Sequence, residues 1–157
     1  MSPKIDAAPL DDFVDRLSDS IDLDSGSAFA RGMLEAADIY MGSMRERFDL
    51  YSERGGDWAE HAPSTQKKRG RGAPILVENG DLRASLERDG VNHLLEIEHD
   101  TIREGSTDPK AIYHQHGTSR MPERAILDGP TQMTLDAMKQ AAVTGLHESA
   151  KDAARGR

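Results

Sequence analysis

The chain has 157 residues, a formal net charge of −8, 31% charged residues and no cysteine. A length near 150 residues is typical of one domain, and the lack of cysteine excludes a disulfide framework, a thiol nucleophile and a cysteine-type zinc site. Leu, Ile, Val and Phe supply only 28 residues, so we predict a small core supplemented by burial against other subunits. Apolar runs such as Ile75–Val77 are too short to span a membrane, and no secretory signal is visible. We therefore expect a soluble protein made in a cytoplasm.

The first segment is acidic and has helical periodicity. Residues 1–30 carry seven Asp and two basic residues, and acidic side chains in the first turn of a helix favour the helix dipole. We predict that residues 1–26 form an acidic helical arm, ended by the polar run at 22–27. Its apolar stripe consists of Leu10, Phe13, Val14, Leu17 and Ile21.

A long second helix is predicted from Ser27, as its cap, to about Tyr51. At ~1.5 Å per residue it would span roughly 37 Å, longer than an average globular helix. Its apolar stripe contains small residues and Met, which is typical of a helix that packs on a sheet or lies between subunits. This stripe consists of Ala30, Met33, Ala37, Tyr40, Met44, Phe48 and Tyr51.

The segment 55–74 is polar, glycine-rich and locally basic, so we predict an exposed loop with at most one helical turn at 64–68. After a turn at Asn79-Gly80, the spacing of Leu82 and Leu86 predicts a short helix.

The pattern then changes to a period of two. Val91, Leu95 and Ile97 alternate with glutamates, which predicts a strand with one solvated face. His99-Asp100 is expected to turn the chain into a second strand at about 101–104.

The remaining segments predict a short helix around 111–113, an edge strand at 125–127, and a final helix with Pro130 at its first position. Residues 151–157 are expected to fray as a flexible tail. The predicted fold is α+β: a small antiparallel sheet packed with a long helix of the N-terminal half and a C-terminal helix, in one domain at 27–150. The stripe of the final helix consists of Leu127, Thr131, Leu135, Met138, Ala142 and Leu146.

Histidines are the obvious candidates for chemistry, because His114 and His116 could bind one metal ion from a strand. However, no HExxH spacing occurs, and no acidic residue stands at an established ligand offset. We expect these histidines, with His93 and His99, to be structural or surface groups. Neither a Gly-x-Ser-x-Gly turn nor a glycine-rich phosphate-binding motif is present. The sequence thus predicts no catalysis, no cofactor and no metal.

A basic cluster, consisting of Lys67, Lys68, Arg69 and Arg71, stands out in an acidic chain. It could contact nucleic-acid phosphates. Alternatively, it could pair with the acidic helix of a neighbouring copy, which carries Asp11, Asp12, Asp15 and Asp19.

Three further positions are candidates for contacts with partners. Trp58, the only tryptophan, either closes the edge of the core or anchors an interface. Arg120 and Arg124 flank Pro122, on a loop suited to bidentate contacts with carboxylates of a neighbouring subunit.

Four short motifs follow one another between residues 55 and 127: GDWA at 56–59, PSTQKK at 63–68, ILVENGDLRASL at 75–86 and AIYHQHGTSRMPERAIL at 111–127. Their order and gaps resemble the phage virion-morphogenesis family, the tail-completion and head–tail joining (neck) proteins of tailed phages and Mu-like prophages. The chain departs from the family pattern at His116, where an aromatic is usual, and at 123–127, where Ala-Arg-Pro-Phe-Leu is frequent. The residues matching structural positions of the family motifs are Gly80, Leu82, His114, Gly117 and Pro122.

The resemblance implies a structural, non-enzymatic virion protein at the neck or head-proximal end of the tail, assembled in the host cytoplasm. It implies a closed ring, with six copies if the ring follows the symmetry of the tail, and no membrane association. Expected partners are other neck, connector or tail-tube proteins, and genomic DNA in the channel. Independently of the resemblance, Gly80 and Gly117 stand where the backbone is expected to need positive φ or a close approach.

Two alternatives of other classes remain open at the level of the sequence. One is a nucleic-acid-binding regulator that uses the basic cluster at 67–71. The other is a small metal-dependent hydrolase that uses His114 and His116.

Overall fold

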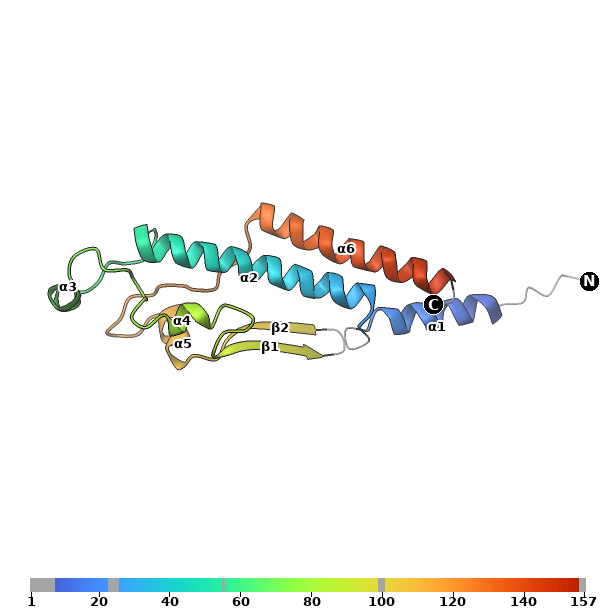
Figure 1. Ribbon diagram of the computed structural model, residues 1–157, viewed down its shortest axis with the longest axis horizontal. Coiled ribbons are helices and arrows are strands. Elements are labelled where there is room, and N and C mark those ends of the chain that lie inside the picture. Colours follow the sequence, from blue (N-terminus) through green and yellow to red (C-terminus); the bar gives the residue numbers. More distant parts are fainter. Residues whose placement is uncertain (1–7, 23–25, 55, 99–100, 156–157) are drawn as a thin grey trace, which may run out of the picture. The chain divides into compact units, whose positions relative to one another are not determined.

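A computed structural model describes residues 8–22, 26–54, 56–98 and 101–155 (Figure 1). Within these ranges six helices accompany one two-stranded antiparallel sheet, which confirms the predicted α+β class, including the long helix of the N-terminal half and the C-terminal helix. The elements are α1 (Ala8–Ser20), α2 (Ala28–Arg54), α3 (Pro63–Arg69), α4 (Asp81–Ala84), β1 (His93–Glu98), β2 (Thr101–Ser106), α5 (Pro109–His116) and α6 (Gln132–Arg155).

The chain divides into two structural units. Unit 1 comprises Met1–Asp38, Ile97–Ile102 and Leu135–Arg157, and unit 2 comprises Ile39–Glu96 and Arg103–Thr134. This division differs from the predicted separation into an arm at 1–26, a domain at 27–150 and a tail at 151–157. Helix α1 belongs to the same unit as α6, and α6 continues to Arg155, with Ala153 only 1% exposed.

Unit 1 is built on a close helix contact in which glycines replace larger side chains. A Cβ on Gly32 of α2 would lie 2.7 Å from the carbonyl oxygen of Ala141 and 2.9 Å from the Cα of Gly145. Because any side chain at this point would collide with backbone, only glycine permits the observed approach.

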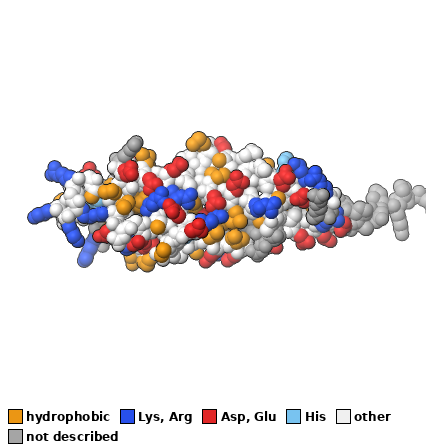
Figure 2. Space-filling view, in the orientation of Figure 1, with side chains coloured by type: hydrophobic (Ala, Val, Ile, Leu, Met, Phe, Trp, Pro, Cys, Tyr) orange, Lys and Arg blue, Asp and Glu red, His pale blue; other side chains and the backbone are white. Residues whose placement is uncertain are grey.

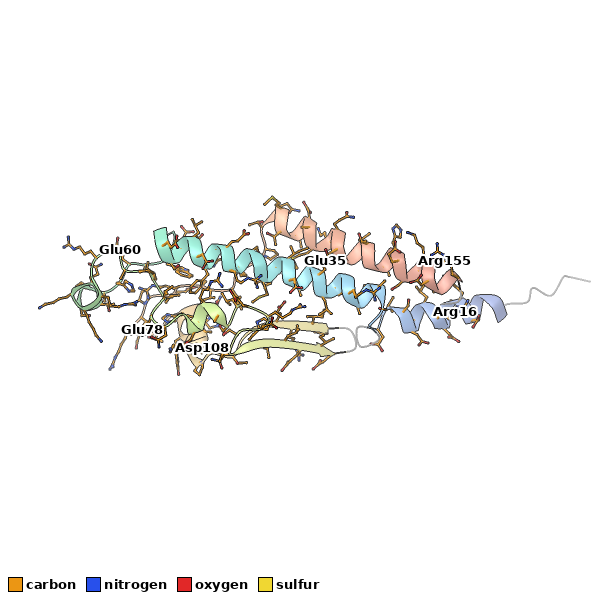
Figure 3. All side chains as sticks on the ribbon, viewed as in Figure 1. Arg16, Glu35, Glu60, Glu78, Asp108 and Arg155 are labelled. Carbon is orange, nitrogen blue, oxygen red and sulfur yellow. The ribbon has the colours of Figure 1, made fainter. Side chains whose placement is uncertain are left out.

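Polar side chains tie the three helices of unit 1 together. Ser149, 1% exposed, accepts a hydrogen bond from the Phe29 amide at 2.9 Å and donates one to the Ser20 carbonyl at 3.3 Å. Arg16, labelled in Figure 3, donates from Nε to the carbonyl of Ala153 at 2.9 Å. One serine thus connects α1, α2 and α6 and satisfies backbone groups near helix ends.

The contact face of α6 differs from the predicted stripe by about one position. The buried residues of the described helix are small, whereas Leu146 is 42% exposed. The predicted stripe was based on the large apolar residues of α6, but a close contact between helices buries small residues instead. The buried residues on this helix are Thr134, Ala141, Gly145, Ser149 and Ala153.

Unit 2 contains the larger apolar cluster. Trp58 packs edge-to-face on Phe48 at 5.3 Å and on Tyr51 at 5.6 Å between ring centroids, an arrangement worth ~0.5–1.5 kcal/mol per pair beyond area burial. The buried members of the cluster are Met41, Phe48, Trp58, Ile75, Leu82, Leu86 and Ile126.

Several local predictions are confirmed. Ser27 caps α2 by accepting a hydrogen bond from the Ala30 amide, and the short helix at Leu82 and the hairpin strands are present. The short helix predicted around 111–113 is present as α5, where Asp108 acts as the cap by accepting a hydrogen bond from the Lys110 amide. The predicted turn at 99–100 lies outside the described residues.

Other local predictions are wrong. The segment 55–74 contains α3, a helix of two turns rather than one, because Pro63 starts it at the first helical position. Helix α6 begins after Pro130, since Thr131 accepts from the Thr134 amide and acts as the cap. The alternation in the first strand fails at its end, where Ile97 is 36% exposed.

None of the described helices combines the length and the apolar composition needed to cross a membrane.

Candidate functional site

Two of the expected interface residues lie inside unit 2 and join distant motifs. Trp58, 6% exposed, donates from Nε1 to the carbonyl of Ala125 at 3.0 Å. Arg124, 7% exposed, donates from Nε to the Ala59 carbonyl and from Nη2 to the Glu60 carbonyl, both at 2.8 Å. Trp58 therefore takes the first of its two predicted roles, at the edge of the core, and Arg124 is buried rather than exposed on the loop that was expected to present it to a neighbouring subunit.

Gln115 explains why residues 125–127 are not the predicted edge strand. Its Oε1 accepts from the amides of Ile126 and Leu127 at 2.9 Å each, and its Nε2 donates to the Leu127 carbonyl at 2.6 Å. One side chain therefore provides the hydrogen bonds that a neighbouring strand would otherwise supply. Gln115 was not among the residues predicted to matter, although it lies between the two histidines of the 111–127 motif.

The two motif glycines have the backbone conformation expected of them. Gly80 has φ 86° and Gly117 has φ 66°, in the region that favours glycine. A Cβ on Gly117 would also lie 2.8 Å from the amide nitrogen of Glu123. Pro122 and Arg120 are exposed in the loop that follows.

Segments that are far apart in the sequence line one cavity of about 190 Å³ in unit 2, which we call the Arg124 pocket. Of the five motif-matched residues, Gly80, Leu82 and His114 lie in its wall. Figure 3 labels Glu78, in the segment before α4, and Asp108, at the start of α5, the two regions that supply much of this wall. The lining consists of His61, Arg69, Leu76, Glu78, Asn79, Gly80, Asp81, Leu82, Lys110, His114 and Arg124.

Backbone strain marks the same pocket. Leu76 has φ 61°, a left-handed conformation that a bulky residue adopts only when its surroundings enforce it. Arg69 donates from Nη2 to the carbonyl of Val77, the next residue. Strain of this kind is concentrated at functional sites, so the Arg124 pocket is the strongest candidate site in the described residues.

The electrostatics of the Arg124 pocket are governed by converging cations. Burial lowers the pKa of His114, and the charges of Arg124 and Lys110 lower it further, while Asp108 opposes them. Burial also lowers the pKa of Arg124. The Nδ1 atom of His114 is buried without a hydrogen-bond partner among the described residues.

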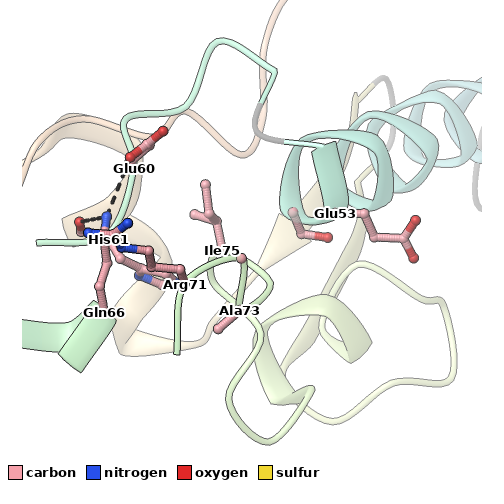
Figure 4. Close-up of a pocket in the computed structure, with 9 residues that line it drawn as sticks. Glu53, Glu60, His61, Gln66, Arg71, Ala73 and Ile75 are labelled. Atoms are coloured by element: carbon pink, nitrogen blue, oxygen red, sulfur yellow. Dashed lines mark hydrogen bonds between the residues drawn. The ribbon is translucent and has the colours of Figure 1, made fainter. Parts of the chain in front are cut away.

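A second cavity of about 550 Å³ lies beside α3 (Figure 4). There Gln66 donates to the carbonyl of His61 at 2.9 Å and to Glu60 at 3.4 Å, and Ile75 forms an apolar wall. Glu60, His61 and Arg71 lie together on one side of this cavity and Glu53 on the other (Figure 4), so side chains of both charges line it.

The basic cluster is partly internal. Lys67, Lys68 and Arg71 are exposed, and Lys and Arg side chains gather around α3 (Figure 2). Arg69, by contrast, is bonded to Val77 and faces the Arg124 pocket. Three cations rather than four are therefore available to an external partner.

One buried polar group has no counterpart among the predicted site residues. His93 and Glu104 have side chains only 4% and 5% exposed, with Nε2 and Oε1 3.2 Å apart, and His93 Nδ1 lies 3.2 Å from the carbonyl of Ser85. The Ser85 hydroxyl donates to the Leu82 carbonyl and is 0% exposed. Because the histidine contacts the carbonyl and not the hydroxyl of this serine, the group does not have the geometry of an activated nucleophile.

His114 and His116, which the sequence offers as metal ligands on a strand, lie on helix α5 instead. Among the described residues no group of three or more His, Asp and Glu side chains could hold a metal ion.

Models of known families, curated proteins and solved structures provide no match to this chain.

Proposed function

We propose that this chain is a structural component of a tailed-phage particle that acts at the head–tail junction, as a ring of identical subunits, without enzymatic activity. The observation that carries the proposal is the convergence of three of the four motifs, those at 56–59, 75–86 and 111–127. Trp58 and Arg124 bond to each other's motif segments, and Gly80, Leu82 and His114 line one pocket. Motifs that interlock in this way have a structural reason to occur in a fixed order, which supports the family resemblance.

Exposed apolar surface in unit 2 favours assembly. Helix α5 has no buried residue, and its Ile112 and Tyr113 are 62% and 55% exposed. Val91, ahead of β1, is 73% exposed. Adjacent large apolar side chains on a surface mark interaction sites when they form a patch.

The sheet provides a second route to a partner. In the described residues β1 and β2 pair only with each other, and a two-stranded sheet is marginally stable by itself. Each strand therefore has an open edge to which a neighbouring chain can add a strand.

The proposal is tested by the mass of the purified chain. Native mass spectrometry is expected to show a closed assembly at micromolar concentration; six copies would have a mass of about 103 kDa, from 17.2 kDa per chain. Ile112→Ser with Tyr113→Ser should shift it to monomer, whereas Lys68→Ser, on exposed α3, should not. A wild-type chain that stays monomeric both alone and when mixed with purified tails would overturn the proposed ring.

A further inference from the structure

The Arg124 pocket is lined by two cations, Lys110 and Arg124, that have no ion-pair partner among the described residues. Three permanent cations, Arg69, Lys110 and Arg124, line it together with two carboxylates, Glu78 and Asp81. The described residues supply no ion-pair partner for Lys110 or Arg124: the guanidinium of Arg124 bonds only to the carbonyls of Ala59 and Glu60. A buried guanidinium without a counter-ion is unusual, because charges in protein interiors are normally paired.

The Nδ1 atom of His114 is a second and independent sign of a ligand. It is buried and has no hydrogen-bond partner in the described part of the chain, although buried polar atoms nearly always have one. The charges that act on this ring are those of Arg124, Lys110 and Asp108. The pocket wall additionally contains His61, Arg69, Glu78 and Asp81.

We propose that the Arg124 pocket binds one carboxylate group, presented by an aspartate or glutamate side chain of a protein partner, with Lys110 and Arg124 as its cationic ligands and His114 as a hydrogen-bond donor. One bound monoanion would give Lys110 and Arg124, which have no ion-pair partner among the described residues, a shared counter-ion. Arg124 is 7% exposed, so its ligand must enter on a narrow arm, as a carboxylate side chain does.

A nucleic-acid backbone fits this pocket less well. Its phosphates are part of a continuous chain, and the exposed carboxylates of Glu78 and Asp81 would repel the phosphates on either side of a bound one. Guanidinium and carboxylate groups, by contrast, form short charge-assisted hydrogen bonds with matched geometry.

Only the choice of a protein as the partner rests on the proposed function. Carboxylate binding is a property of the single chain and is tested without any assembly, so the two proposals fail separately.

The test is an NMR titration of the wild-type chain with sodium acetate at constant ionic strength, at a concentration where the chain is monomeric. The probe is the Cε1–Hε1 signal of His114, assigned by comparison with His114→Gln. We expect a saturable shift and a rise of the pKa of His114, because a bound anion favours the protonated ring. Lys110→Gln should weaken acetate binding roughly threefold to fivefold, and Lys68→Gln, the matched control on α3, should leave it unchanged.

Three results would overturn the proposal. The first is a shift with acetate no larger than the shift with chloride. The second is equal weakening by Lys110→Gln and Lys68→Gln, which would indicate a general charge effect. The third is saturation by inorganic phosphate at a lower concentration than acetate, which would assign the pocket to a phosphate group.

Discussion

Gly32 of α2 and Gly145 of α6 form the closest helix contact of unit 1: a Cβ on Gly145 would lie 2.6 Å from the carbonyl oxygen of Ala28 and 3.0 Å from the Cα of Gly32. Neither Gly32 nor Gly145 is among the residues that have positive φ. Their role is therefore to give space to the opposing backbone and not to permit an unusual conformation.

This relationship predicts a large penalty for a single methyl group. Gly145→Ala should lower the free energy of unfolding by about 1–3 kcal/mol, because the new methyl group collides with backbone that cannot move independently of its helix. Gly42→Ala is the matched control: its Cβ would meet only the end of the Arg45 side chain, at 3.7 Å. That change should stabilise α2 by up to ~1 kcal/mol through helix propensity. Chemical denaturation of both variants measures the difference, and equal effects would contradict the account.

The same contact shows what periodicity can and cannot predict. Helices α2 and α6 were both expected from their periodic apolar residues, and Met44 and Phe48 are buried as predicted. The contact face of α6 was not predicted correctly, because two helices that approach closely bury Gly, Ala and Ser rather than large apolar residues. Leu146 lies outside it for the same reason.

Arg124 is predicted to stabilise the isolated subunit. Arg124→Ala removes two hydrogen bonds from a buried side chain to the carbonyls of Ala59 and Glu60 and should lower the free energy of unfolding by about 2–4 kcal/mol. Arg120→Ala, four residues earlier in the same exposed loop, should change it by less than ~0.5 kcal/mol. Thermal and urea unfolding of the two variants provide the measurement. An Arg124→Ala chain as stable as wild type would return this residue to the class of interface residues.

The inward position of Arg124 could not be deduced from the sequence, because an arginine beside an exposed proline is typical of a surface loop. Its burial depends on the carbonyls of residues 59–60, which tertiary folding brings to it. The same applies to Gln115, whose bonds to residues 126–127 replace a predicted strand. By contrast, Gly80 and Gly117 were predictable, since their requirement is local.

Acid is predicted to weaken unit 2 through Asp49. Hydrogen bonds from Arg83, at 2.8 and 2.9 Å, lower the pKa of Asp49. A carboxyl with a lowered pKa in the folded state contributes stability above its unfolded pKa of about 3.9 and loses it as the pH falls through the lowered value. Asp49→Asn should therefore cost about 0.5–1 kcal/mol at pH 7, since the side chain is 47% exposed.

The decisive comparison for Asp49 is between two pH values. In urea unfolding the difference between wild type and Asp49→Asn should become smaller at pH 3 than at pH 7. Asp89→Asn changes an exposed carboxyl and should show no such difference. A penalty that is independent of pH would mean that the charge of Asp49 is not the source of its contribution.

The free chain is predicted to bind duplex DNA weakly. Only Lys67, Lys68 and Arg71 of the basic cluster are exposed, and three phosphate contacts imply a log–log salt slope of roughly −2.7. At physiological salt we expect a dissociation constant above about 10 μM, within the range of non-specific binding. Sub-micromolar binding that is lost on replacing these three residues by Ala would favour the regulator over the neck protein.

The central proposal, a role in joining heads to tails, is tested most directly in the genome that encodes the chain. An early stop codon at Trp58 should leave filled heads and tails unjoined in lysates viewed by electron microscopy, and the wild-type chain supplied in trans should restore complete particles. Normal numbers of complete, infectious particles without the chain would contradict the account.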